Sequence, residues 1–259
     1  ESIEVLRGPF SSLYGNSSGG VINIITEEPR KGNEIELNQV FGTDSTSRTG
    51  IKFNTGSDDF GWVLDMSQFE TDGYRNHSQA KRDNVNSKMV FRPSKDTKIS
   101  WLLNYVDMPE VQDPLGLTAA QLAANRKQAG TGAELRNARK SVDQLQTGVV
   151  IDHSFSATTG LVFSPYIGER NIRQVLGSGV VIDLKNEYSG ADIRLRHQTE
   201  LLSSPLLLNV GVTLGELDQA RKGFATETAP ANRIESNTAE QSDQYLQAEW
   251  LLSEKWAVL

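Results

Sequence analysis

The sequence predicts an all-β chain that forms part of an antiparallel, up-and-down transmembrane β-barrel. Apolar and polar residues alternate with period two in segments such as 98–106, 144–152 and 206–215, as expected of strands with one apolar and one polar face. Short polar turns alternate with connections of varied length, which is typical of the two unlike rims of an outer-membrane barrel. The polar faces carry Asn, Gln, Asp, Lys and Arg, so the apolar faces would point to lipid.

The predicted strands follow one another from residue 33 to the end of the chain. Most contain ten or more residues, enough to cross a bilayer when tilted. Short turns are expected at 57–59, 94–96, 156–158, 202–204 and 253–254, and longer connections at 43–47, 72–79, 109–136, 177–179 and 221–242. We count ten full strands and the start of an eleventh, which makes about ten to eleven strands of a larger barrel.

The longest connection has helical character. After the turn signal Asp113-Pro114-Leu115-Gly116, residues 117–125 are strong helix formers with Thr118 as an N-cap. This helix either covers the rim of the barrel or helps to close over a ligand.

Composition excludes several classes of function. With 26 Lys and Arg against 33 Asp and Glu, the 259-residue chain has a net charge of −7, which argues against nucleic-acid binding. It has no cysteine, and its three histidines are far apart, so no metal site is expected. No catalytic triad or paired-carboxylate motif is present, and no catalytic residue is predicted. A soluble β-sandwich with one wet face remains an alternative to the membrane barrel.

The first 26 residues do not follow the hairpin pattern. They predict a short strand, a Gly-Pro turn, a tight segment, a glycine-rich turn and an apolar strand at 21–25 that we expect to be buried on both faces. A phosphate-binding loop is a poor interpretation, because no Gly-Lys-Ser/Thr follows the glycines and a strand replaces the required helix.

The segment IEVLRGPFSSLYGNSSGGVINIIT closely resembles the C-terminal end of the plug domain of TonB-dependent outer-membrane receptors. The shared pattern is an acidic residue, a hydrophobic pair, Arg-Gly-Pro, Tyr-Gly, Gly-Gly-Val-Ile-Asn-Ile and Thr. The resemblance implies that residues 1–31 are the end of a plug domain and residues 32–259 the N-terminal half of a barrel of about 22 strands. Because the chain starts at Glu1 and stops inside a predicted strand, we expect a fragment of a longer protein.

The resemblance also implies a function: ligand-gated, energy-coupled import across the bacterial outer membrane. The expected ligand is a ferric siderophore or a similar scarce compound, and iron would enter only as part of the bound chelate, without a resident cofactor. The expected partners are a TonB-type energy-coupling protein, whose binding box lies outside this chain, and outer-membrane lipid. The alternatives are a passive porin, an extracellular ligand-binding or adhesive β-protein, and an outer-membrane esterase.

A few residues are candidates for specific roles. The resemblance implies that Arg7 pairs with a carboxylate facing the bore, for which Glu4, Glu36 and Glu249 are candidates; capping of nearby carbonyls is the alternative. The plug glycines Gly8, Gly15, Gly19 and Gly20 are best explained by turn geometry.

Ligand contacts are predicted at the outer rim and in the plug. Tyr74 and Arg75, next to His77, form an aromatic and cationic loop tip that is able to touch an anionic chelate, although such tips are often only solvated. Tyr14 either faces the ligand or is simply packed. Aromatic girdles at the membrane interfaces are expected from Trp62, Trp101, Trp250 and Trp256.

Overall fold

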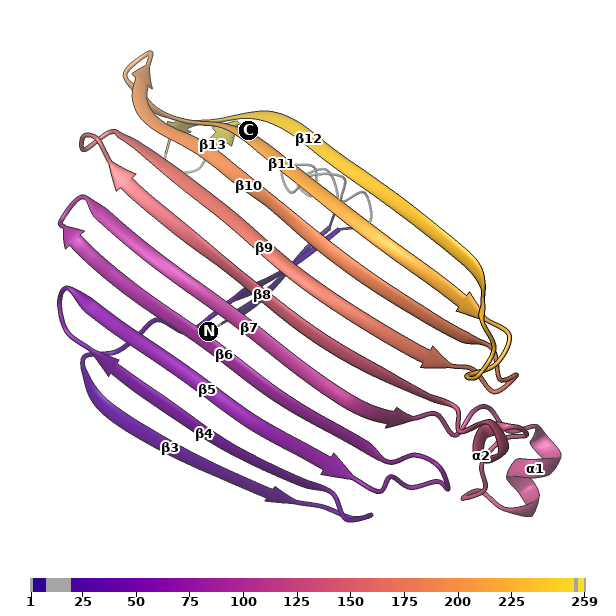
Figure 1. The fold of residues 1–259 in the computed structure, drawn as a ribbon. Coiled ribbons are helices and arrows are strands. Elements are labelled where there is room, and N and C mark those ends of the chain that lie inside the picture. The colour runs from indigo at the N-terminus through magenta and orange to yellow at the C-terminus, as the bar shows by residue number, and fades with distance from the viewer. Residues whose placement is uncertain (1, 8–19, 254–255, 259) are drawn as a thin grey trace.

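The computed structural model describes residues 2–7, 20–253 and 256–258. One antiparallel sheet of eleven strands, β3 to β13, contains most of the chain, and a separate ribbon of two strands precedes it (Figure 1). Each strand of the sheet pairs only with its neighbours in sequence. The sheet is therefore an up-and-down meander, which confirms the predicted fold class and the count of ten full strands and the start of an eleventh.

The elements have the following bounds. The ribbon consists of β1 (Ser2–Leu6) and β2 (Val21–Ile25). The sheet consists of β3 (Gly32–Phe41), β4 (Ser47–Gly56), β5 (Phe60–Thr71), β6 (Ala80–Ser94), β7 (Thr97–Gln112), β8 (Arg139–Ser154), β9 (Thr159–Val175), β10 (Val181–Leu201), β11 (Ser204–Phe224), β12 (Ala231–Ser253) and β13 (Trp256–Val258). Two short helices, α1 (Ala119–Ala124) and α2 (Ala133–Arg136), lie between β7 and β8.

The strands become longer along the chain, from 10 residues in β3 to 23 in β12. Two of the predicted long connections are therefore too long: β7 continues to Gln112, and the connection expected at 221–242 shrinks to residues 225–230. A strand of 23 residues spans about 75 Å, more than a bilayer requires. In the part that extends beyond the lipid both faces are polar, so the alternation that identifies strands is lost although the backbone ladder continues.

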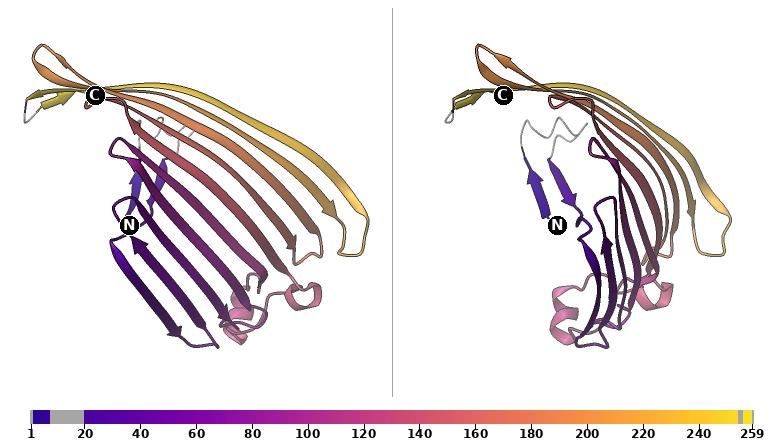
Figure 2. Two further views of the ribbon diagram at one scale, coloured as in Figure 1. Left: turned by 60° about the vertical axis from the view of Figure 1, so that its left-hand side comes forward. Right: turned by 90° about the vertical axis from the view of Figure 1, so that its left-hand side faces the viewer.

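The sheet is strongly curved, and the ribbon lies on its concave side (Figure 2). Lys52, Lys88 and Lys98 contact the segment that follows the ribbon, so they and the residues in register with them face the concave side. Trp101, Ile151 and Leu208 belong to the opposite set, and no second sheet covers them among the described residues. This arrangement is that of a barrel wall and not of a sandwich.

The convex face carries the apolar band. Large apolar side chains in this band are exposed, for example Leu37 at 76% in β3 and Leu246 at 70% in β12. The band shifts along successive strands, from the middle of β3 to the turn end of β12, as expected when tilted strands cross a flat lipid layer. Trp62, Trp101 and Trp250 lie near the short-turn end of their strands, but a girdle stays a prediction.

The helix prediction at 117–125 is confirmed. Thr118 Oγ1 accepts a hydrogen bond from Gln121 N, and Gln121 Oε1 accepts one from Thr118 N, which completes a capping box at the start of α1. No helix in the described part of the chain has the length and the apolar character needed to cross a bilayer.

The prediction that strand 21–25 is buried on both faces is wrong for the described residues. Ile22 is 69% and Ile24 63% exposed, because a ribbon of two strands covers neither of its own faces. Gly20, just before β2, has φ +120°, and a Cβ there would lie 2.7 Å from the carbonyl oxygen of Leu6. Gly20 is thus required by the backbone geometry.

Candidate functional site

The segment that links the ribbon to the sheet is held against the concave wall by ion pairs. Glu28 Oε1 accepts a hydrogen bond from Lys88 Nζ at 2.7 Å, and its Oε2 accepts one from Lys98 Nζ at 3.0 Å. Glu27 is paired with Lys52. Residues 26–31 are called the linker here, and these ion pairs to β4, β6 and β7 are called the tether.

The linker backbone also packs closely on the wall. A Cβ at Gly61 would lie 2.5 Å from Pro29 Cβ, and one at Gly56 would collide with the carbonyl oxygen of Arg30. The backbone N–H of Arg30 donates to Oδ1 of Asn54 at 3.0 Å, and Asn54 is buried. Glycines in β4 and β5 thus permit an approach that any side chain would block.

The lysines keep both linker carboxylates ionised. The hydrogen bond from Lys52 holds the pKa of Glu27 below its ordinary value of 4.5. Burial alone would raise the pKa of Glu28, but the hydrogen bonds from Lys88 and Lys98 outweigh it, and the pKa is also below 4.5. The Lys88 side chain is only 12% exposed, so loss of Glu28 would leave a largely buried ammonium group without its counter-charge.

The sequence analysis missed the tether because it expected the opposite arrangement, an arginine before the sheet and carboxylates on the wall. In the structure Arg7 is exposed. Glu4 accepts a hydrogen bond from Asn23 Nδ2 and Glu36 one from Asn38 Nδ2, and within residues 2–7, 20–253 and 256–258 neither these two nor Glu249 forms an ion pair with Arg7. The Arg7 pairing stays a prediction. Gly8, Tyr14, Gly15 and Gly19 lie outside the described residues.

At the long-loop rim, Arg75 joins two connections. Its Nη1 donates to the carbonyl oxygen of Leu115 at 2.7 Å, its Nη2 to those of Pro114 at 2.9 Å and Gln128 at 3.0 Å, and its Nε to Gln128 at 3.1 Å. The guanidinium thus fastens residues 72–79 to residues 113–138.

The neighbours of Arg75 strengthen this connection. A ring nitrogen of His77 lies 2.8 Å from the carbonyl oxygen of Ala138. Tyr74 is 55% exposed, with Lys127 Nζ 5.3 Å from its ring centre. The predicted ligand contacts of Tyr74 and Arg75 stay predictions, and the geometry gives Arg75 a structural role in addition.

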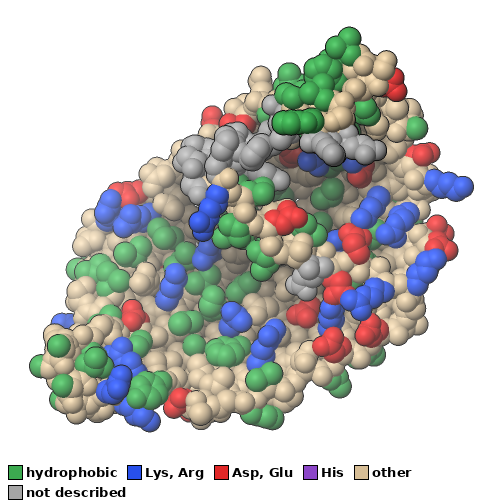
Figure 3. Space-filling view, turned by 180° about the vertical axis from the view of Figure 1, so that it is seen from behind, with side chains coloured by type: hydrophobic (Ala, Val, Ile, Leu, Met, Phe, Trp, Pro, Cys, Tyr) green, Lys and Arg blue, Asp and Glu red, His purple; other side chains and the backbone are tan. Residues whose placement is uncertain are grey.

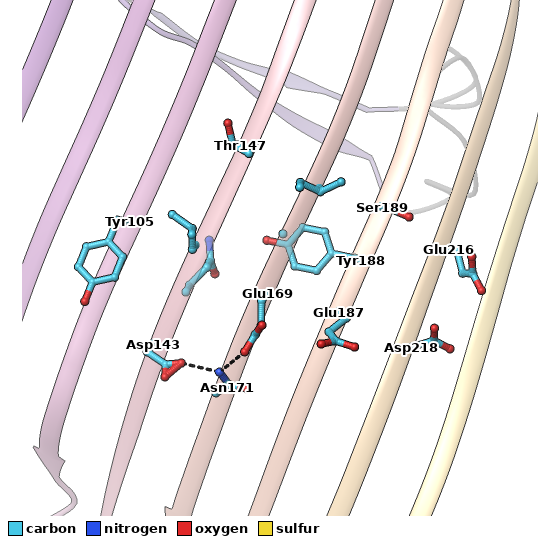
Figure 4. Close-up of a pocket in the computed structure, with 14 residues that line it drawn as sticks. Tyr105, Asp143, Thr147, Glu169, Asn171, Glu187, Tyr188, Ser189, Glu216 and Asp218 are labelled. Carbon is cyan, nitrogen blue, oxygen red and sulfur yellow. Dashed lines mark hydrogen bonds between the residues drawn. The ribbon is translucent and has the colours of Figure 1, made fainter.

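Two further surfaces complete the candidate site. Charged side chains are distributed over the concave face, around the linker (Figure 3). On the convex face, on the loop side of the apolar band, carboxylates gather in a shallow depression, where Asn171 Nδ2 donates to Asp143 at 2.8 Å and to Glu169 at 2.7 Å (Figure 4). No group of three or more His, Asp or Glu side chains that is suited to hold a metal ion occurs in the described ranges.

Comparison with known proteins identifies similar receptors, although no family model matches the chain. The ferrichrome outer membrane transporter/phage receptor of Escherichia coli K12 is 28% identical over 200 residues, which are 73% of this chain and 27% of that protein. The metal-pseudopaline receptor CntO of Pseudomonas aeruginosa is 28% identical over 103 residues, 38% of this chain and 14% of the receptor. The chain thus spans about a quarter of the first relative's length.

The same fold occurs in solved receptor structures. The unliganded ferric citrate transporter FecA superimposes with a TM-score of 0.84 at 20% identity, over 97% of this chain and 40% of that chain. The homologues and structural neighbours of this chain are therefore TonB-dependent siderophore receptors of the bacterial outer membrane, and the chain has the fold of such a receptor over nearly all of its length.

Proposed function

We propose that the complete protein is a ligand-gated, energy-coupled importer of a ferric siderophore in the bacterial outer membrane. The observation that carries this proposal is the tether, which holds the linker of the ribbon inside the concave face of the sheet. A passive porin needs an open, water-filled bore, and a segment preceding the sheet that lies on the concave side argues against that function. The relatives are a ferrichrome transporter and a metal-pseudopaline receptor, which supports a metal chelate as the ligand.

In this proposal residues 1–31 are the end of the plug domain and residues 32–259 the first half of the barrel. The eleven strands form an open sheet, and further strands of the same protein would close it. The convex apolar band would contact lipid. A TonB-type protein would supply the energy through a part of the plug outside this chain.

The tether has a defined task in such a cycle. Import requires the plug to rearrange while its C-terminal end stays joined to the barrel. Three lysine contacts on β4, β6 and β7, together with the packing on Gly56 and Gly61, fix the linker to the wall. A pull on the plug would therefore act on the ribbon and the preceding segments before it moved the linker.

The proposal is tested by uptake of radioactive iron. The full gene is expressed in an iron-starved bacterium that lacks its own siderophore receptors, with and without its energy-coupling protein, and ferric chelates are supplied. We expect uptake of at least one chelate that stops when the coupling protein is deleted. Uptake that continues without the coupling protein would indicate a passive porin instead.

A further inference from the structure

The concave face on the loop side of the tether is basic, although the chain as a whole is acidic. The strand register assigns each paired residue to the concave or the convex face. On this part of the concave face the cations are Arg48, Arg82, Lys140, Arg170, Arg221 and Arg233, and the carboxylate among them is Glu235. On the convex face at similar height lie Asp83, Asp107, Asp143, Glu169, Glu187, Glu216, Asp218 and Glu240. The convex face also carries the cations Lys81, Arg173, Lys185 and Lys222. Acidic residues therefore outnumber basic ones on the convex face, whereas basic residues outnumber acidic ones on this part of the concave face.

The charges on the concave face are not balanced within the described part of the chain. Glu235 lies 2.6 Å from Arg233 and 3.9 Å from Arg221, so two guanidinium groups share one carboxylate. Arg221 Nε is buried and has no hydrogen-bond partner. Arg170 is exposed and has no ion pair among the described residues.

Arg170 occupies the gap in a row of amide side chains, called the amide belt here. On one side Asn86, Asn104 and Gln144 are joined by hydrogen bonds of 2.6 and 3.3 Å, and on the other Asn186, Gln219 and Asn237 by bonds of 2.8 and 3.4 Å. In the strand register Arg170 stands directly between Gln144 and Asn186. The belt thus crosses the concave wall from β6 to β12 with one cation in its middle.

Aromatic rings beside the belt lie flat on the wall. A Cβ at Gly168 would collide with the ring of Tyr188, and one at Gly190 would lie 2.5 Å from the hydroxyl of Tyr166. Each tyrosine is in register with the glycine of the other strand. Because the rings cover glycines, they do not fill the space in front of Arg170.

We propose that the amide belt and the cations beside it bind a ferric chelate with net negative charge, through its oxyanion groups. This inference rests on the proposed import function and specifies its ligand class. A neutral ligand that displaced water from this wall would leave the guanidinium groups without compensation, which is unfavourable. An anionic chelate compensates Arg170 and the Arg221–Arg233 pair with charge-assisted hydrogen bonds, while the amides bond to its uncharged polar groups.

The test uses the full-length receptor and three ferric chelates: ferric citrate and ferric enterobactin, which are anionic, and ferrichrome, which has no net charge. Binding and uptake are measured for the wild type, for Arg170→Gln and for a matched control, Arg173→Gln. Arg173 lies on the same strand but faces the convex side, where it pairs with Asp183 at 2.8 Å.

We expect uptake of an anionic chelate, with an affinity that falls as salt rises. Arg170→Gln should weaken its binding by about tenfold or more, and Arg173→Gln should change it by less than about twofold. Uptake of ferrichrome alone, or equal effects of the two substitutions, would overturn the charge assignment and leave the import function intact. Uptake of none of the three chelates would count against the import function, and the ligand assignment would be rejected with it.

Discussion

Replacing Glu28 by Gln in the full-length protein should release the linker from the wall. The carboxylate bridges two lysines of different burial: Lys88, 12% exposed, and Lys98, 39% exposed. Loss of a hydrogen bond to a largely buried charged group costs about 1.5–3 kcal/mol, and loss of the more exposed pair about 0.2–1 kcal/mol. We therefore expect the linker contact to weaken by about 2 kcal/mol.

The assay is hydrogen–deuterium exchange of the linker in the purified full-length protein. If opening precedes exchange, 2 kcal/mol corresponds to roughly 30-fold faster exchange in residues 26–31, while the strands of the sheet keep their protection. Glu34→Gln is the matched control, because Glu34 is 61% exposed and lies 3.9 Å from its partner Arg30. Exchange that is unchanged in Glu28→Gln, or equally accelerated in Glu34→Gln, would refute the tether as the anchor. Adding Lys88→Glu to a Glu28→Lys variant should restore part of the protection.

Three further outcomes follow from the geometry. The tether should be complete above about pH 4.5 and lost as the pH falls through the lowered pKa values of Glu27 and Glu28. Hydrogen exchange of the linker, corrected for its intrinsic pH dependence, should therefore become faster as the pH falls. In a Glu27→Gln/Glu28→Gln variant the corrected exchange should not depend on pH in this way. Arg75→Ala removes hydrogen bonds to three carbonyl groups, so trypsin should cut at Arg126 and Lys127 about tenfold faster or more. Arg75→Lys should restore protection only partly, because lysine lacks the forked guanidinium donors. Equal cleavage rates in the wild type and Arg75→Ala would contradict this role. Gly61→Ala should displace Pro29 and destabilise the linker contact by about 1–3 kcal/mol, seen as faster linker exchange, whereas Gly116→Ala, with open space around its Cβ position, should have no such effect.

The strands that cross the apolar band are predictable from the sequence, because there each residue is either lipid-facing or bore-facing. In β7, Ile99, Trp101 and Leu103 alternate with neighbours of which only Leu102 is apolar, and the structure places these three on the convex side. The capping box at Thr118 is equally local, since both partners lie within one turn of helix. Such signals depend on neighbours in sequence and require no knowledge of the register.

The loop-side halves of the long strands carry no such signal. In β12, residues 235–243 are mostly polar on both faces, so they resemble a loop in sequence although each pairs with β11. The tether is hidden for a different reason. Lys52, Lys88 and Lys98 meet Glu27 and Glu28 only because three strands and the linker converge, and no spacing in the sequence records that convergence.

The position of the cations explains why whole-chain charge is a poor guide to the bore. The net charge of −7 arises largely on the convex face beyond the apolar band, where acidic residues outnumber basic ones. On the concave face, the lysines near the turn side are compensated by the linker carboxylates, whereas Arg170 near the loop side has no such partner in the described part of the chain. One wall thus uses the same sign of charge twice, to hold two carboxylates of the protein's own linker and, in our proposal, to attract an anionic chelate. Because Lys52, Lys88 and Lys98 are already paired with linker carboxylates, a chelate that enters from the loop side would find its strongest attraction at the belt and not at the tether.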